Sequence, residues 1–264
     1  EMKYDFLVFA AGSKTNFFGN SDMPKKTLSL KGIEDAIIMR NELIRTMEKA
    51  AVEQDPEERR KLLTFVIVGG GATGVEIAGV LAEMKKYIVT KDYPELKKAE
   101  GAIHIVDGQD NLLAPMSKKT HKAAYETLTR MGVNVKLHTV VSSYQDDKVT
   151  FSDGQSVEAK TVIWCAGVTA NVFDGIPKDS LGRGNRMKTD VFNQVIGLEN
   201  IYAVGDISLQ ETDPVYPKGH PQLAQPAIQQ GRHLARNFLA VAKGNDRKPF
   251  KYFDRGDMAI IGRN

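Results

Sequence analysis

Three glycines in the spacing Gly-x-Gly-x-x-Gly constrain the fold of this chain more than any other feature. The motif spans Gly69 to Gly74, follows the apolar run Phe65–Val68, and precedes a stretch, Val75 to Met84, with small and apolar residues at helical spacing. A buried strand, a tight glycine turn and a helix in this order are typical of the unit that binds a dinucleotide in parallel α/β sheets. A glycine-rich turn without a ligand is the alternative interpretation.

Each glycine of the motif meets a different steric need of such a unit. Gly69 permits the tight turn, Gly71 lets the backbone approach a diphosphate without a Cβ in the way, and Gly74 lets the helix pack close to the strand. The amino end of the helix then offers free N–H groups and a partial positive charge to the phosphates. The motif therefore predicts dinucleotide binding.

The rest of the pattern predicts an α/β fold. Continuous apolar runs, typical of buried parallel strands, alternate with segments at helical spacing, and this order implies a parallel, doubly wound sheet. We interpret residues 55–61 as a charged, solvated break and residues 87–100 as a mixed, charged stretch. Further strands are expected at 6–10, 102–107, 133–137, 161–167 and 200–206, a hairpin with an Asp-Gly turn at 148–158, and helices at 33–52, 117–131 and 222–242.

An acidic residue at the end of the next strand is the expected partner of the glycine motif. Asp107 follows the apolar run 102–106 and would hold the ribose hydroxyls of the nucleotide. It stands 33 residues after Gly74, whereas about 20 is usual. The extra length is the charged stretch 87–100, which can loop out without moving the strand. A carboxylate there favours NADH over NADPH, because a 2′-phosphate would meet a negative charge. The alternative is a plain turn at Asp107-Gly108.

Two later segments carry weaker signals. A buried strand delivers Asp206 to its carboxyl end, where open α/β sheets bind ligands, although strand-Gly-Asp turns are common. Gln225 and Gln229 are four residues apart and lie on one helical face. Ala224 and Ala227 would let that helix approach a bulky planar ligand, but a solvated helix start explains the same residues.

Composition excludes several classes of function. The chain has 264 residues and a net charge of +3, which gives no support for a nucleic-acid partner. One cysteine, Cys165, excludes a disulfide framework and a CxxC redox pair, and fits a reducing cytoplasm. The five histidines lack metal-ligand spacing, so no metal site is expected. No apolar run is long enough to span a membrane.

Taken together, the motifs resemble those of the FAD-dependent pyridine-nucleotide oxidoreductase superfamily, whose members have two Rossmann-like domains. Residues 4–13 are similar to its Ala-Thr-Gly strand, with Ala11 in place of threonine, residues 69–76 to its NAD(P)H glycine loop, and residues 201–206 to its second FAD motif. Within the superfamily, residues 70–76, 162–168 and 224–231 resemble type II NADH:quinone oxidoreductases (NADH dehydrogenases). The likeness covers nearly the whole chain, and the last segment is its most discriminating part.

The resemblance implies roles for individual residues, with FAD and NADH as cofactors. Gly205 and Asp206 would contact the ribityl and phosphate region of the flavin, and Ala224 and Gln225 would lie near its isoalloxazine ring. Gln225 and Gln229 would line a quinone site. The remaining implied positions are Glu76, near the meeting place of nicotinamide and flavin, and the strand-ending glycines Gly12 and Gly167 in the cofactor sites. A carboxylate in a first helical turn, favoured by the helix dipole, is the alternative for Glu76.

The resemblance also implies an organisation for the chain. A Rossmann-like NADH-binding domain at 24–168 is expected to be inserted between FAD-domain segments at 1–23 and 169–245, with 246–264 beginning a C-terminal domain. Both ends look cut. The family's first FAD glycine loop would precede residue 1, and its membrane anchor would follow residue 264, so the fragment alone is expected to be inactive.

For the parent protein, the resemblance implies a non-proton-pumping NADH:quinone oxidoreductase. Such an enzyme would be cytoplasmic and peripheral on the inner face of the cell membrane, with NADH and a quinone as partners. The resemblance leaves open whether it forms a homodimer. Two alternatives remain open from the residues: a non-catalytic dinucleotide-binding or redox-sensing module, and a flavoenzyme similar to ferredoxin or rubredoxin reductases.

Overall fold

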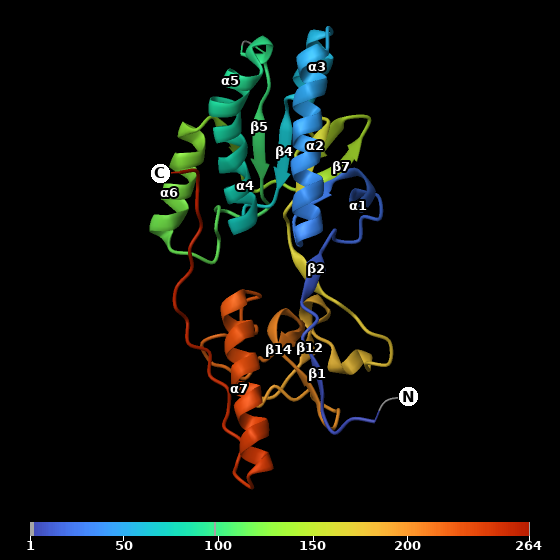
Figure 1. Ribbon diagram of the computed structural model, residues 1–264, viewed down its shortest axis with the longest axis vertical. Helices are drawn as coiled ribbons and strands as arrows, with labels where there is room; N and C mark the ends of the chain where they lie inside the picture. The colour runs from blue at the N-terminus through green and yellow to red at the C-terminus, as the bar shows by residue number, and fades with distance from the viewer. Residues whose placement is uncertain (1–2, 98, 264) are drawn as a thin grey trace. The chain divides into compact units, whose positions relative to one another are not determined.

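A five-stranded parallel sheet carries the glycine motif (Figure 1). Every neighbouring pair in it is parallel, and Phe65 to Val68 align with Thr161 to Trp164 on one side and with Ile103 to Val106 on the other. The computed structural model describes residues 3–97 and 99–263. The strands, in spatial order, are β3 (Leu28–Ser29), β10 (Thr161–Trp164), β4 (Phe65–Val68), β5 (Ile103–Val106) and β6 (Val133–Lys136).

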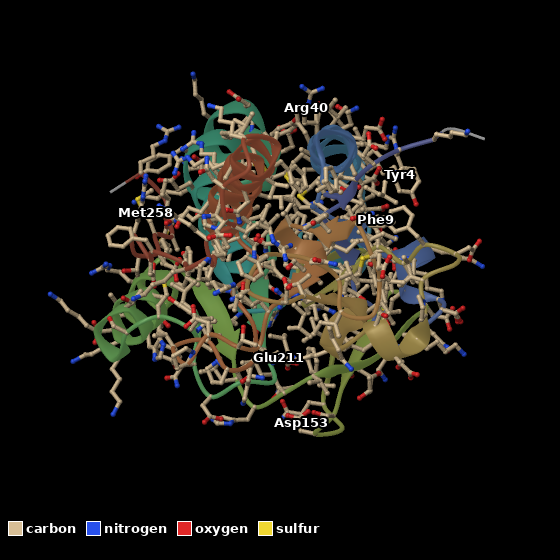
Figure 2. The ribbon with its side chains drawn as sticks, turned by 90° about the horizontal axis from the view of Figure 1, so that it is seen from below. Tyr4, Phe9, Arg40, Asp153, Glu211 and Met258 are labelled. Carbon is tan, nitrogen blue, oxygen red and sulfur yellow. The ribbon has the colours of Figure 1, made fainter. Side chains whose placement is uncertain are left out.

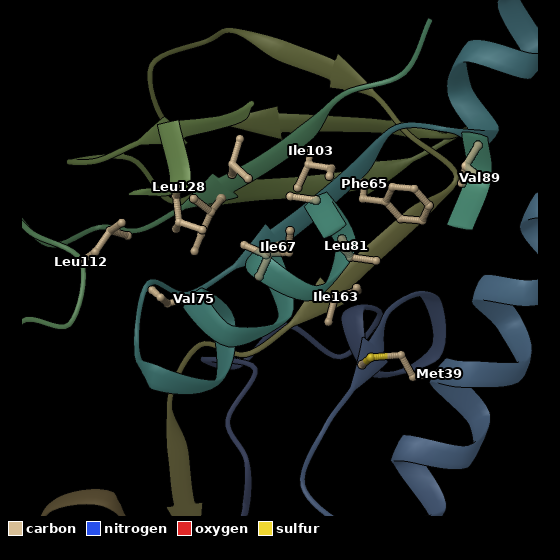
Figure 3. Close-up of a cluster of buried hydrophobic side chains, with 14 of the residues drawn as sticks. Met39, Phe65, Ile67, Val75, Leu81, Val89, Ile103, Leu112, Leu128 and Ile163 are labelled. Carbon is tan, nitrogen blue, oxygen red and sulfur yellow. The ribbon is translucent and has the colours of Figure 1, made fainter. Parts of the chain in front are cut away.

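Helices cover one face of this sheet. Several of them supply buried residues to the same core cluster, which includes Ile67, Ile103 and Ile163 from the strands (Figure 3). Val75 and Leu81 of α4 lie beside these strand residues, which explains the small, apolar face expected of that helix. These helices include α2 (Ile33–Val52), α4 (Ala72–Glu83) and α6 (Lys118–Arg130).

The opposite face is covered differently from the doubly wound expectation, which places helices on both sides. Val66, Val162 and Trp164 point to that face and pack against Val149 and Phe151 of an antiparallel sheet. The hairpin predicted at 148–158 is confirmed as part of this sheet, whereas its first strand was not predicted. The sheet consists of β7 (Val141–Gln145), β8 (Lys148–Phe151) and β9 (Ser156–Glu158).

A second set of short strands pairs residues near the start of the chain with residues 201–203, and residues 187–188 with 208–209. Leu7 to Phe9 align in parallel with Ile201 to Ala203, and Met187 and Lys188 with Ser208 and Leu209. The strands are β1 (Leu7–Phe9), β2 (Ser13–Thr15), β11 (Val168–Ala170), β12 (Met187–Lys188), β13 (Ile201–Ala203) and β14 (Ser208–Leu209). The same part of the chain contains the short 3₁₀-helices η3 (Lys178–Ser180), η4 (Arg183–Asn185) and η5 (Gly205–Ile207), and the long helix α7 (Ala224–Ala242).

One interpretation of a charged segment was wrong. Residues 55–61 are not a break, because helix α3 (Pro56–Leu62) begins there with proline in its first turn and Asp55 accepting the N–H of Glu57. The stretch 87–100 also contains helical turns. They are η1 (Met84–Val89, a π-helix), α5 (Thr90–Asp92) and η2 (Pro94–Leu96), and α1 (Met23–Lys26) adds a short turn near the start of the chain.

The described residues form two compact units. The first takes the residues up to Lys14 and the range Val168–Gly256, and the second takes Thr15–Gly167 and the residues from Asp257 onward. Residues 15–23 belong with the second unit because Met23 is buried in its core beside Trp164. None of the helices in the described residues is both long and apolar enough to cross a membrane.

Candidate functional site

The glycine loop is held by close backbone packing at its two outer glycines. Gly69 has φ +110°, and a Cβ there would lie 2.7 Å from the backbone N of Ala166. A Cβ on Gly74 would lie 1.8 Å from the carbonyl oxygen of Gly69. Both positions therefore exclude a side chain, one by conformation and contact and the other by contact alone.

The middle glycine faces open space instead. Gly71 is the N-cap of α4, and a Cβ there would meet nothing within 4 Å. Among the described residues no side chain caps this helix, and its first turn lacks intrahelical partners for the N–H groups. The loop thus presents backbone amides and the positive end of a helix dipole to an anion.

Asp107 lies beside this loop despite its long separation in sequence. Its carboxylate accepts hydrogen bonds from the N–H of Gly70 and from the N–H of Gln109, the latter at 2.7 Å. The intervening residues fold into α4, η1, α5 and η2, so β5 still pairs directly with β4. The carboxylate therefore stands where the glycine loop and the end of β5 meet.

The two strand-ending glycines both adopt positive φ, but their surroundings differ. Gly12 has φ +67° and Gly167 has φ +68°. A Cβ on Gly12 would meet nothing within 4 Å, whereas a Cβ on Gly167 would lie 2.6 Å from the ring of Phe18. Gly167 therefore permits the close approach of the Phe18 ring, while the space beside Gly12 is unoccupied by other protein atoms.

Asp206 is hydrogen-bonded to Ser13, the first residue of β2, within the first unit. Ser13 Oγ donates to its Oδ2 at 2.5 Å, and Gln222 Nε2 donates to its backbone oxygen at 3.1 Å. Its neighbour Gly205 has φ +75° and donates its N–H to Gln230 Oε1 at 2.6 Å. Ser13 and Gln230 were not predicted as site residues, although both lie inside motifs that the sequence singled out.

A buried arginine near Asp206 was missed entirely. Arg186 donates through Nε and Nη2 to the backbone oxygen of Ser208, and through Nη2 to that of His220 at 2.9 Å. Burial lowers the pKa of its guanidinium to about 10, while the charge of Asp206 opposes that shift. Local pattern gives no signal for it, because its partners lie 22 and 34 residues away.

The two glutamines of α7 share a helical face as predicted, and both bind backbone. Gln229 donates to the oxygen of Phe253 at 2.8 Å and accepts the N–H of Phe253 at 3.0 Å. Gln225 Nε2 donates to the oxygen of Gly256 at 2.9 Å, and its buried Oε1 has no hydrogen-bond partner among the described residues. Ala224 is the first residue of the same helix.

The second unit also contains Glu76, on the helix that follows the glycine loop. Its Oε1 accepts the N–H of Ile260 at 3.1 Å. The predicted residues therefore gather in two groups. Gly69, Gly71, Gly74, Glu76, Asp107 and Gly167 belong to the second unit, and Gly12, Gly205, Asp206, Ala224, Gln225 and Gln229 to the first. In the described part of the chain no three acidic, histidine or cysteine side chains could hold a metal ion.

The single cysteine should be unreactive in the folded protein. Cys165 directly follows β10, and burial raises the pKa of its thiol to about 12, whereas a free cysteine titrates at about 8.5. We expect a thiol reagent such as dithionitrobenzoate to label it at pH 8 at least about a hundredfold more slowly than in guanidinium-unfolded protein, because the thiolate is the attacking form. Equal rates in the two states would contradict the burial of this thiol.

The sequence of this chain is similar to those of known proteins. The model of the pyridine nucleotide-disulphide oxidoreductase family matches residues 1–231. Type II NADH:quinone oxidoreductase Ndh of Mycobacterium tuberculosis is 32% identical, over 98% of this chain and 57% of its own length. The chain therefore spans little more than half of that relative.

Solved structures show the same fold. NDH2 of Plasmodium falciparum, solved in complex with NADH, aligns with a TM-score of 0.89 at 21% identity, covering 99% of this chain and 69% of that one. A ferredoxin reductase of Rhodopseudomonas palustris aligns with a TM-score of 0.70 at 17% identity, covering 96% of this chain and 55% of that one. With the family model matched over most of its length, this chain belongs to the pyridine nucleotide-disulphide oxidoreductase family.

Proposed function

We propose that this chain carries the NADH site and part of the FAD site of a non-proton-pumping NADH:quinone oxidoreductase. The observation that carries the proposal is the loop from Gly69 to Gly74, which combines an open face at Gly71 with an uncapped helix start. A diphosphate placed over Gly71 would accept hydrogen bonds from the first N–H groups of α4 and be stabilised by the helix dipole. The similarity to named NADH:quinone oxidoreductases supports the choice of nucleotide.

Asp107 would select between the two nicotinamide nucleotides. Its carboxylate lies against the loop at Gly70, where the adenine ribose of a nucleotide on this loop would be bound. We expect Asp107→Asn to improve the affinity for NADPH relative to NADH by at least about tenfold, because the charge that repels a 2′-phosphate is removed. Dissociation constants for both nucleotides, measured by calorimetry, check this.

Asp110→Asn provides the matched control for that measurement. This neighbouring carboxylate has 81% of its side chain exposed and pairs with His138, so its removal should leave the preference unchanged. An unchanged preference in Asp107→Asn, or an equal change in both variants, would contradict the assignment.

The first unit would hold the flavin through the residues that meet at Asp206. The backbone at Gly12 is open, and Ser13, Gly205 and Asp206 form one hydrogen-bonded group with Gln230. Such a group fits the ribityl portion of FAD, since it offers a carboxylate to hydroxyl groups. When bound, FAD would accept hydride from NADH and pass electrons on to a quinone.

The quinone and the nicotinamide would be placed by residues near the helix starts. Ala224, Gln225 and Gln229 would lie at the isoalloxazine and quinone end, and Glu76 near the nicotinamide. The buried, unpartnered Oε1 of Gln225 supports a ligand hydrogen bond there, because an unpaired buried acceptor is costly. A parent enzyme of this kind would work at the cytoplasmic membrane surface, as a monomer or as a homodimer.

The absorbance spectrum of the protein from its native source, with and without NADH, tests the proposal. Flavin absorbance that bleaches on adding NADH and returns with a soluble quinone is the expected result. NADH binding without any flavin signal or electron transfer would favour a non-catalytic dinucleotide-binding module. That second candidate is kept because the glutamine side chains expected at the quinone are already bonded to Phe253 and Gly256.

A reductase with a protein acceptor is separated by mutation. Substituting Gln225 or Gln229 should raise the KM for the quinone if they line its site. Unaltered acceptor kinetics in both variants would instead support a ferredoxin- or rubredoxin-reductase-like enzyme.

A further inference from the structure

Two carboxylates on one side of α4 accept backbone hydrogen bonds from residues 260 and 263. Glu76, Gly79 and Glu83 follow one another at spacings of three and four residues, which places them along one side of the helix. Glu76 Oε1 accepts the N–H of Ile260 at 3.1 Å, and Glu83 Oε1 accepts the N–H of Arg263 at 2.9 Å. Hydrogen bonds to ionised carboxylates are stronger than those between neutral groups.

The spacing of the two carboxylates matches the spacing of the two amides. Seven residues along a helix rise about 10.5 Å, and three residues of extended chain span at most about 10 to 11 Å. Glu76 and Glu83 are seven residues apart, and Ile260 and Arg263 are three apart. The helix therefore presents its two acceptors at a separation that the segment from Ile260 to Arg263 can span.

Glycine clears the space between the two carboxylates. A Cβ on Gly79 would lie 3.0 Å from the backbone N of Gly262 and 3.3 Å from Cγ2 of Ile261. Gly262 itself has φ +69°, a conformation that other residues rarely adopt. Both contacts show that the segment lies against the helix backbone.

The side chains of the segment alternate as they would in a strand on a surface. Ala259 and Ile261 pack against the main core cluster, whereas Ile260 is 59% exposed and Met258, labelled in Figure 2, is 79% exposed. The segment has no regular secondary structure, so its position depends on these apolar contacts and on the two carboxylates.

We propose that Glu76, Gly79 and Glu83 form a docking site for residues 259–263 of this chain, and that Glu76 is a positioning residue. Its carboxylate accepts a backbone N–H and orients the segment against the helix that begins at the nucleotide loop. A glutamine can accept the same hydrogen bond, so the site requires an acceptor and not a proton donor. The evidence for docking is these contacts. Only the expected effect of Glu76 variants on NADH turnover rests on the proposed function.

Amide hydrogen exchange of residues 259–263 tests the docking. We expect Glu76→Ala to speed exchange at Ile260 about tenfold or more, and Glu76→Gln to stay within about threefold of the wild type. Gly262→Ala should speed exchange at both Ile260 and Arg263 without adding an atom to α4, so it tests the same contact from the side of the segment. Val80→Ala, at a 55% exposed position of the same helix, is the control and should change nothing.

Two outcomes would overturn the proposal. The first is exchange at Ile260 in the wild type as fast as in an unstructured peptide. The second is an equal loss of NADH turnover in Glu76→Gln and Glu76→Ala, which would assign proton transfer to Glu76, whereas positioning predicts that glutamine restores most of what alanine loses. If the wild type shows no turnover, the proposed function fails, and the exchange rates still decide whether the segment docks.

Discussion

Gly74→Ala should destabilise the second unit by about 3 kcal/mol or more. The added Cβ would lie 1.8 Å from the carbonyl oxygen of Gly69 and 3.4 Å from Cγ2 of Ile67. A flexible side chain could move aside, but a backbone oxygen in the tight turn cannot, so α4 must separate from β4 and uncover the core. Denaturant unfolding followed by circular dichroism measures the loss of free energy.

A helical glycine elsewhere gives the matched control. Gly231 lies inside α7, and a Cβ there would meet nothing within 4 Å. Gly231→Ala should therefore raise the free energy of unfolding by about 0.5 to 1 kcal/mol, because alanine is the better helix former. A Gly74→Ala protein as stable as the wild type would show that the helix does not pack on the strand as described.

Gly71→Ala should do the reverse: leave the fold intact and abolish most nucleotide binding. Its φ of −72° suits any residue, and the new methyl group meets nothing in the protein, so the free energy of unfolding should change by less than about 0.5 kcal/mol. The methyl would occupy the space through which a diphosphate reaches the helix start. We expect the affinity for NADH to fall at least about tenfold, or about 1.4 kcal/mol.

Calorimetric titration with NADH measures this effect. The nearby Gly108→Ala would be an unsuitable control, because its added Cβ would lie 2.9 Å from Cγ1 of Val140. Gly231→Ala again serves, since it should leave NADH affinity unchanged. Wild-type affinity in a folded Gly71→Ala protein would mean that the diphosphate does not lie over this loop. Failure of the wild type to bind NADH would sink the proposed function itself.

Regular elements with strong local signals were predicted well. The bounds of α2 and β4 coincide with those expected, because apolar periodicity and a continuous buried run are properties of neighbouring residues. The helix expected at 117–131 is also present as α6, and the side chain of Ser117 caps it by accepting the N–H of Thr120. Helix α3 was not predicted because most of its residues are charged. Asp55 and Pro56 nevertheless form a signal for the start of a helix.

The fold class was also predictable, but the cover of the sheet was not. The alternation of strands and helices correctly indicated a parallel α/β sheet. It could not show that β7, β8 and β9 cover the second face, because that depends on which apolar side chains meet across more than a hundred residues, such as Met23 and Val149. The functional roles assigned to the site residues remain predictions.

By itself, the sequence determined the glycine loop, the strand before it and the helix after it, because each follows from the shapes of adjacent residues. Only the tertiary structure decided what the polar side chains do. Glu76 bonds to an amide 184 residues away, Asp107 to the loop 37 residues before it, and Ser13 to Asp206 across 193 residues. Hydrogen bonds between residues so distant in sequence form only after the chain is packed, so no local pattern encodes them.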